Sequence, residues 1–357
     1  MSQTIIHICG DCKGGTEKYV NDLIQLYPSP QYNHIIERNI PFVINNIDSI
    51  YLVHIHCVFF ESNIGWNILS IIEQFKNASK NILFYLTIHD YQWLFDCNIL
   101  YPLKTIDDRY LCKEYYSKNN SEKLQQLFNT IDRIFIPSQR VFEIYKYFMD
   151  KDLTLKYINK MHIIQHCDIY TRLEQLYIPY ISNNIINIAF IGTFNEYKGG
   201  PIFLELIYNL RNYKDYIIHY HIFGKHTQSE HDNKLLDYVH FHGSYKNNKL
   251  IEQLYANNIH IITSLSVFEE TYCYALSLLI NSGLPIVYLN RGALLTRLCD
   301  KYSRMFPFTE SSFCIIKDTI IKTIEYIELN QGRKDLIDIS NNVILNEEYN
   351  NLYLPKQ

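Results

Sequence analysis

A lysine beside two glycines stands where a phosphate group could be held. Residues 185–191 form a short β-branched run typical of a strand, and Gly192, Thr193 and Lys198 follow it before the glycine pair 199–200 opens an apolar helical segment. Backbone N–H groups at a helix start and a nearby cation together favour an anion such as a pyrophosphate. A solvated lysine in an ordinary turn fits the same residues.

A histidine occupies a comparable place in the first half of the chain. His89 directly follows a predicted strand, residues 82–88, and Asp90 stands beside it. Ligands of open α/β sheets bind beyond the carboxyl ends of the strands. Single histidines are usually structural, but this position makes His89 a candidate catalytic residue.

A second glycine pair, Gly14 and Gly15, lies between a predicted strand at residues 4–9 and an amphipathic helix that starts at Thr16. Glycines there let backbone N–H groups approach an anion at the positive end of the helix dipole. The same pair would also suit a tight turn that needs positive φ angles.

Two adjacent carboxylates, Glu269 and Glu270, follow a strand that ends at Thr263. We expect a helix that begins at Glu270 and is stopped by Gly283 and Pro285. The carboxylates either cap this helix or accept hydrogen bonds from sugar hydroxyls.

Composition excludes several classes of protein. The chain has 357 residues, of which 47% are hydrophobic and 20% charged, and its formal net charge is −4. This profile indicates a globular protein and argues against a nucleic-acid partner. Because no uninterrupted apolar run of about 18 residues occurs, we predict a cytoplasmic protein (host cytoplasm if viral) with at most peripheral membrane contact.

The nine cysteines are scattered, and most lie in apolar runs, which favours buried thiols in a reducing compartment. Cys9 and Cys12 form a C-x-x-C, but no second pair follows at the spacing of a structural zinc site. We therefore predict no metal site.

Short β-branched and aromatic runs alternate with helical segments, which predicts an α/β fold with parallel sheets. The expected strands are residues 4–9, 49–58, 82–88, 133–136 and 162–165, then 185–191, 217–223, 239–242, 259–263 and 285–288. At this length we expect two domains, residues 1–178 and 179–330. Residues 331–357 form a tail that either packs back on the first domain or frays.

Taken in order, these blocks resemble the family 4 glycosyltransferases, in particular polysaccharide-type members from bacteria and viruses, giant viruses among them. The matching motifs are Gly14-Gly15-Thr16-Glu17, His89-Asp90-Tyr91-Gln92-Trp93, Pro137-Ser138, Gly192 to Gly199, and Glu269-Glu270-Thr271-Tyr272 to Val287. The match spans roughly residues 5–300, and its last block is the most specific.

The resemblance implies a GT-B fold, in which two Rossmann-like, doubly wound parallel-sheet domains face a cleft. It also implies retention of anomeric configuration and no required metal or other cofactor. By resemblance, Lys198 holds the diphosphate, Glu270 contacts sugar hydroxyls and His89 faces the transferred sugar. His89 and Glu270 are thus the expected catalytic residues. The expected donor site also includes Gly14, Gly15, Gly192, Thr193, Glu269, Thr271 and Tyr272.

Three departures from the family pattern bear on the nucleotide. Thr193 replaces an arginine that often follows the glycine, and Phe268 and Glu269 replace the usual tryptophan and proline. Leu278 stands where a second glutamate normally binds the ribose. If the helix begins at Glu270, position 278 approaches the nucleotide pocket, and otherwise Leu278 belongs to the core.

We expect a glycosyltransferase that moves a hexosyl group from a nucleoside-diphosphate sugar, bound by the C-terminal domain, to a hydroxyl of a glycan or other acceptor, bound by the N-terminal one. A sugar-nucleotide epimerase on the same fold ranks lower. A non-catalytic sugar-binding or scaffolding protein is the rival of a different class, and Thr193 and Leu278 keep it open.

Overall fold

The computed structural model describes residues 3–10, 14–28, 32–38, 47–59, 64–79, 81–95, 118–149, 155–166, 177–225, 238–294, 304–333 and 351–353. The chain divides into two compact units, residues 1–169 with 340–357, and residues 170–339. The sequence predicts this division between residues 178 and 179. Residue 178 goes with the second unit because Ile178 exchanges backbone hydrogen bonds with Gly332 (2.8 Å) and Arg333 (3.3 Å).

The first unit contains a six-stranded sheet whose order is β2-β1-β3-β4-β5-β6. All of its pairings are parallel. The strands are β1 (Gln3–Ile8), β2 (Tyr32–Glu37), β3 (Ile50–Ile55), β4 (Leu83–Thr87), β5 (Arg133–Ile136) and β6 (Met161–Ile163). The chain order reverses between β1 and β3, so ligands are expected beyond the carboxyl ends of these two strands.

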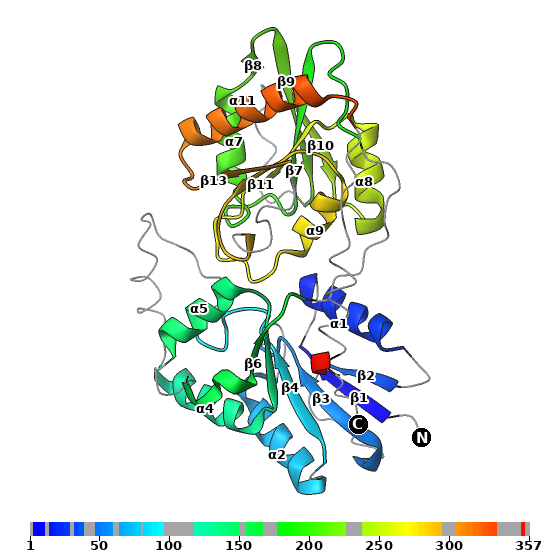
Figure 1. The fold of residues 1–357 in the computed structure, drawn as a ribbon, viewed down its shortest axis with the longest axis vertical. Coiled ribbons are helices and arrows are strands. Elements are labelled where there is room, and N and C mark those ends of the chain that lie inside the picture. The colour runs from blue at the N-terminus through cyan, green and yellow to red at the C-terminus, as the bar shows by residue number, and fades with distance from the viewer. Residues whose placement is uncertain are drawn as a thin grey trace. The chain divides into compact units, whose positions relative to one another are not determined.

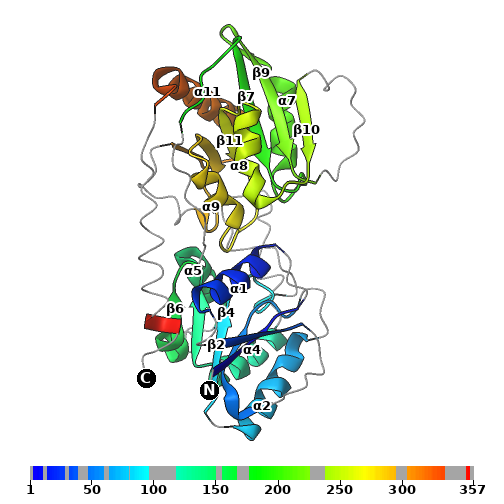
Figure 2. The same cartoon turned by 90° about the vertical axis from the view of Figure 1, so that its right-hand side faces the viewer.

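The two faces of this sheet differ in chemistry, and Figures 1 and 2 show the helices that accompany the sheet. One face packs an aliphatic and aromatic core against three helices, α2 (Ile68–Ala78), α4 (Lys118–Thr130) and α5 (Gln139–Phe148). The other face carries histidines, and Tyr19 of α1 (Gly15–Leu26) packs against them. Tyr353, far along the sequence, is fully buried in the same unit. The described residues of this unit also form three short 3-10 turns: η1 (Ile47–Ser49), η2 (Gly65–Asn67) and η3 (Ile158–Lys160).

The second unit has a seven-stranded sheet in the order β10-β9-β7-β11-β12-β13, with β8 beside β9. Only β8 pairs antiparallel among these described strands. They are β7 (Ile185–Ile191), β8 (Asn212–Tyr213), β9 (Tyr216–Phe223), β10 (Val239–Gly243), β11 (Ile261–Ser264), β12 (Ile286–Leu289) and β13 (Met305–Phe308). The chain order reverses between β7 and β11, which places the expected ligand crevice there.

Helices cover both faces of this second sheet (Figure 1). The helices α7 (Gly200–Asn209) and α11 (Phe313–Asn330) share one apolar cluster with β7 and β9. The helices α8 (Asn247–Ala256) and α9 (Tyr274–Asn281) share the other. The predicted doubly wound α/β architecture is therefore confirmed for each unit.

The helix expected to begin at Glu270 begins instead at Tyr274, so that prediction was wrong. Cys273 precedes the helix with a left-handed backbone (φ 65°), and Glu270 stays in the loop after β11. Leu278 is 6% exposed and packs in the apolar cluster of α8 and α9. The alternative reading, that Leu278 belongs to the core, is the one the structure favours.

Among the described residues, no helix has the length and apolar character needed to cross a bilayer.

Candidate active site

The loop after β7 is shaped by glycines that no other residue could replace without strain. Gly192 has φ 122° and Gly199 has φ 83°, both in the region that L side chains rarely adopt. A Cβ atom on Gly199 would lie 2.2 Å from the backbone oxygen of Leu265. Glycine at 199 therefore lets the loop that carries Lys198 approach the loop that follows β11.

That approach brings together two residues that the sequence analysis selected separately. The Nζ atom of Lys198 donates a hydrogen bond to Oε1 of Glu270 at 2.5 Å. The hydroxyl of Ser266, itself buried, donates to the same oxygen at 2.7 Å. The side chain of Lys198 is 35% exposed and that of Glu270 only 9%, so the lysine is the accessible partner of the pair.

The lysine stays charged at this position. Burial is the largest single influence and lowers the pKa of Lys198, but Glu270, Cys273 and Tyr245 together raise it by more, so the net shift is upward. The ammonium group also lies 4.7 Å from the centre of the Phe268 ring, within cation–π range. The loops thus hold a fixed positive charge against one carboxylate.

Backbone and arginine contacts hold the Glu270 loop in place. The amide of Val267 donates to the carbonyl of Tyr197 at 3.0 Å, and Nη1 of Arg291 donates to the carbonyl of Val267 at 2.8 Å. Arg291 is not among the residues predicted from the sequence. The sequence feature that could have indicated it is an Arg-Gly pair three residues beyond the end of the predicted strand 285–288.

Gly292 explains how the chain passes so close to Glu270. It has φ 59°, and a Cβ atom there would lie 2.5 Å from the backbone nitrogen of Glu270. The amide of Ala293 donates to the carbonyl of Glu270 at 2.7 Å. Three loops, after β7, β11 and β12, therefore meet at the carboxyl edge of the sheet, beside its switch point.

The remaining predicted donor residues of this unit lie on the same loops but differ in exposure. Thr193 and Thr271 are half-buried. Glu269 and Tyr272 are buried, and the Tyr272 ring lies 4.7 Å from that of Tyr274. Leu278, the remaining predicted donor residue, is buried in the apolar cluster of α8 and α9.

In the first unit, the glycine pair forms the start of α1. Gly14 is exposed, precedes the helix with φ 68°, and accepts a hydrogen bond from the amide of Lys18 at 3.1 Å. Gly15 is the first residue of α1. Residues 11–13, which complete the loop, lie outside the described residues, as does Cys12 of the C-x-x-C.

His89 is half-buried just beyond β4 and joins a group of aromatic rings. Its Nε2 atom lies 3.2 Å from Nδ1 of His56, and its ring centre lies 5.1 Å from that of Tyr19 and 4.8 Å from that of His166. Burial lowers the pKa of His89 to about 3, so the imidazole is neutral at pH 7.

The carboxylate of Asp90 stabilises the local turn. Its carboxylate accepts hydrogen bonds from the thiol of Cys57 at 3.1 Å and from the amide of Gln92 at 2.9 Å. Burial raises the pKa of Asp90, while these two hydrogen bonds oppose that rise.

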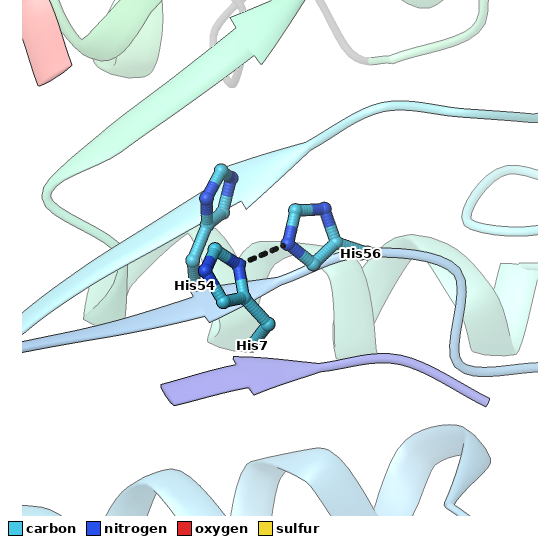
Figure 3. A group of neighbouring side chains, drawn as sticks. All are labelled: His7, His54 and His56. Atoms are coloured by element: carbon cyan, nitrogen blue, oxygen red, sulfur yellow. Dashed lines mark hydrogen bonds between the residues drawn. The ribbon is translucent and has the colours of Figure 1, made fainter. Parts of the chain in front are cut away.

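Three buried histidines beside His89 form a group that the sequence analysis did not select. His7, His54 and His56 offer ring nitrogens within 4.8 Å of one another, an arrangement that could hold a metal ion (Figure 3). In the structure, hydrogen bonds already engage these nitrogens. His7 pairs with His56 at 3.1 Å, and His54 bonds Tyr353 at 2.8 Å and Thr87 at 2.7 Å. The sequence feature that could have indicated part of this group is the strand period of two, which places residues 54 and 56 on the same face of the sheet.

Neither a protein-family model nor a curated protein sequence matches this chain. Solved structures do match over its whole length. HepE from Anabaena, solved with UDP, is similar with a TM-score of 0.61 and 12% identity, covering 97% of this chain and 98% of its own. A glycosyltransferase from Rickettsia africae gives a TM-score of 0.60 at 12% identity, with 100% of both chains covered.

The lipopolysaccharide outer core galactosyltransferase WaaB gives a TM-score of 0.57 at 10% identity and covers 98% of both chains. At such identities the likeness concerns architecture. Together with the two doubly wound parallel sheets, it shows that this chain has the GT-B fold.

Proposed function

We propose that this chain is a glycosyltransferase that moves a hexosyl group from a nucleoside-diphosphate sugar to a hydroxyl acceptor, with retention of configuration. The fold supports this, because structures of the same architecture include HepE solved with UDP and glucose. The single observation that carries the proposal is the Lys198–Glu270 pair at the switch point of the second sheet.

Lys198 is suited to hold the diphosphate of the donor. An ammonium group has three N–H donors, and the bond to Glu270 uses one of them. Its partial exposure lets an anion reach the other two while the bond to Glu270 keeps the side chain in position. A cation fixed in this way stabilises the charge that develops on the leaving diphosphate.

Glu270 is suited to bind sugar hydroxyls. Among the described residues, both side-chain hydrogen bonds that it accepts, from Lys198 and Ser266, go to Oε1. Its second oxygen, Oε2, can accept a hydrogen bond from a hydroxyl group. The geometry supports a division in which Lys198 faces the phosphates and Glu270 faces the sugar.

We further propose that transfer needs no metal ion or other cofactor. The charge that Mg²⁺ would neutralise elsewhere is met here by Lys198 and by the positive end of α7, whose first residues directly follow it. In the first unit, Gly14 and Gly15 would approach the donor phosphates and His89 the transferred sugar, with the acceptor bound on that side.

Donor screening tests the proposal. Saturation-transfer NMR of the full chain against UDP-, GDP- and TDP-sugars should identify one nucleotide that binds, with Lys198→Ala as the variant that loses it. Incubation of that donor with candidate acceptors should then yield a glycoside of unchanged anomeric configuration. An inverted product would refute retention, and free hexose without acceptor dependence would refute transfer.

A non-catalytic sugar-binding or scaffolding role is the second candidate, and one observation favours it. Position 278 is a leucine in the apolar core, and a leucine has no carboxylate that could bind ribose hydroxyls. This reading predicts that none of the nucleotide sugars binds, whereas glycans alone do.

A further inference from the structure

A continuous chain of hydrogen bonds crosses the first sheet and ends on His89. It runs from the carbonyl of Tyr27 to His34 (2.6 Å), then to His7 (3.0 Å), to His56 (3.1 Å) and to His89 (3.2 Å). These four histidines follow the spatial order of the strands, since they lie on β2, on β1, just after β3 and just after β4. We refer to His34, His7, His56 and His89 as the imidazole chain.

All four members are neutral at pH 7. Burial, followed by repulsion from His34, lowers the pKa of His7 to about 3, and burial lowers that of His89 to about 3. The pKa of His56 is lowered well below its usual value by burial and by the neighbouring histidines. The pKa of His34 is lowered mainly by burial, which outweighs its bond to Tyr27. A neutral imidazole has one N–H donor and one unprotonated acceptor nitrogen.

The direction of every bond in the chain follows from its first member. A backbone carbonyl only accepts, so Nε2 of His34 must carry the proton and its Nδ1 must be the acceptor. His7 therefore donates from Nε2 to His34, and its Nδ1 accepts from Nε2 of His56.

The last link follows in the same way. Nδ1 of His56 is an acceptor, so Nε2 of His89 is the donor that bonds it. The carbonyl of Tyr27 thus sets the tautomer of a residue three strands away, and His89 is left with an unprotonated Nδ1.

In the second unit, a backbone carbonyl likewise fixes the tautomer of a histidine, His260. His260 must donate from Nε2 to the carbonyl of Tyr180 at 3.3 Å, which leaves its Nδ1 as an acceptor. That Nδ1 atom lies 3.0 Å from the backbone amide of Asn187, which can only donate.

We propose that His34, His7 and His56 are positioning residues that hold His89 as its Nε2–H tautomer and fix the orientation of its ring. The expected effect on transfer rests on the proposed function. The tautomer itself does not, because it follows from the hydrogen bonds alone.

A bound metal ion would produce the opposite tautomer. A ligating nitrogen must be unprotonated, so a metal held by Nδ1 of His7 and Nε2 of His56 would force the proton of His56 to Nδ1. That proton would then be donated to Nε2 of His89, whose own proton would move to Nδ1. The position of the proton on His89 therefore distinguishes the hydrogen-bonded imidazole chain from a metal ion bound by His7, His54 and His56, the three histidines drawn in Figure 3.

The experiment is long-range ¹H–¹⁵N NMR of the full chain, with ¹⁵N-labelled histidine at pH 7 and the His89 signals identified by their loss in His89→Asn. We expect Nε2 of His89 to be protonated and Nδ1 unprotonated, in protein whose zinc content by mass spectrometry is well below one ion per chain. Protonated Nδ1, or stoichiometric metal, would overturn the proposal.

Variants of the first member test its control over the last. His34→Phe keeps the ring stack on His7 (centroids 5.3 Å apart, planes 14° apart) but removes the acceptor and the bond to Tyr27, so His89 should become a mixture of tautomers. His34→Asn retains an acceptor oxygen near the Nδ1 position and should restore the Nε2–H form. His162→Phe is the matched control, because His162 is also a half-buried histidine on an edge strand of this sheet.

Kinetics provide the second measurement. In His34→Phe we expect kcat to fall by about tenfold with the KM for the donor unchanged, and His34→Asn to recover most of that loss. His162→Phe should retain the wild-type kcat. A folded His34→Phe protein with an unchanged His89 tautomer would overturn the positioning role. If no donor is turned over at all, the proposed function fails while the NMR result still decides the tautomer.

Discussion

Lys198 and Glu270 stand 72 positions apart in the sequence, and their side chains meet at 2.5 Å in the second unit. The carboxylate is nearly buried and the lysine is one-third exposed, so the pair presents its positive member to a ligand. Buried charges persist when they are paired, and here Ser266 provides an additional hydrogen bond. Contacts within the protein therefore hold the two side chains together.

Replacing Lys198 with alanine should lower kcat/KM by about 10² or more. A cation that faces a developing diphosphate in a partly dry site is worth on the order of 3 kcal/mol. Steady-state kinetics with the identified donor measure the loss. Lys249→Ala is the control, because Lys249 is exposed and pairs only with nearby Glu252 in the described structure. A wild-type rate for Lys198→Ala would place the diphosphate elsewhere.

His89→Ala should depress transfer while nucleotide affinity stays nearly constant. The reason is that His89 belongs to the first unit, whereas Lys198 and Glu270 belong to the second. We expect kcat to fall by about tenfold, the worth of a lost hydrogen bond to the sugar. Calorimetry with the nucleoside diphosphate gives the affinity. Parallel losses in affinity and rate would contradict this division of roles.

Turnover should continue in excess EDTA. Lys198 and the first turn of α7 supply the positive charge that a divalent ion supplies in other transferases. The measurement is initial rate before and after chelation, followed by addition of Mg²⁺ or Mn²⁺. Complete loss with recovery on adding metal would refute a metal-independent transfer.

Leu278→Glu should destabilise the protein without strengthening nucleotide binding. Leu278 is 6% exposed in an apolar cluster, and an unpaired carboxylate buried there costs roughly 2 kcal/mol or more. Leu278→Met, which preserves volume, is the control. A thermal melt combined with calorimetry separates the effects, and tighter nucleotide binding at an unchanged melting temperature would show that position 278 reaches the ribose.

The first unit should lose stability as the pH falls from about 6.5 toward 3. Burial, followed by repulsion from His34, lowers the pKa of His7 from 6.5 to about 3, so the unfolded chain binds a proton in this range that the folded chain does not. The stabilisation is complete above pH 6.5, and His7 alone should cost roughly 2 kcal/mol at pH 5.

Urea unfolding at pH 7 and pH 5 tests this acid sensitivity. His7→Phe should show a smaller loss between the two pH values, since one buried imidazole is removed. His162→Phe should fall between the wild type and His7→Phe, because burial also lowers the pKa of His162 but this histidine is only half-buried. Equal stability of the wild-type protein at both pH values would mean that these histidines are protonated in the folded state.

Much of the fold was predictable because buried parallel strands read as short apolar runs. The structure places β5 and β7 at the predicted residues 133–136 and 185–191. The missed strands lie at sheet edges, where the pattern weakens. In β2, exposed residues alternate with half-buried ones, and β13 contains Pro307, which an edge strand tolerates.

The candidate site was predictable as a set of residues and not as a set of contacts. Motif order selected Lys198 and Glu270, but their direct contact depends on Gly199 and Gly292 bringing three loops together. The imidazole chain was invisible because its members are scattered over four strands and become neighbours only through parallel pairing. The helix begins at Tyr274 because Cys273 has a left-handed backbone, and a cysteine gives no indication of that conformation in the sequence.

Tyr353 has a consequence for the order in which the protein can form during synthesis. Its ring is fully buried in the first unit, stacks on Tyr27 at 5.0 Å and bonds His54. Residues 170–339, the whole second unit, leave the ribosome before it does. The second unit can therefore fold while the chain is still being synthesised. The histidine face of the first unit acquires its contacts with Tyr353 only after residues 340–357 have been translated, long after its own strands.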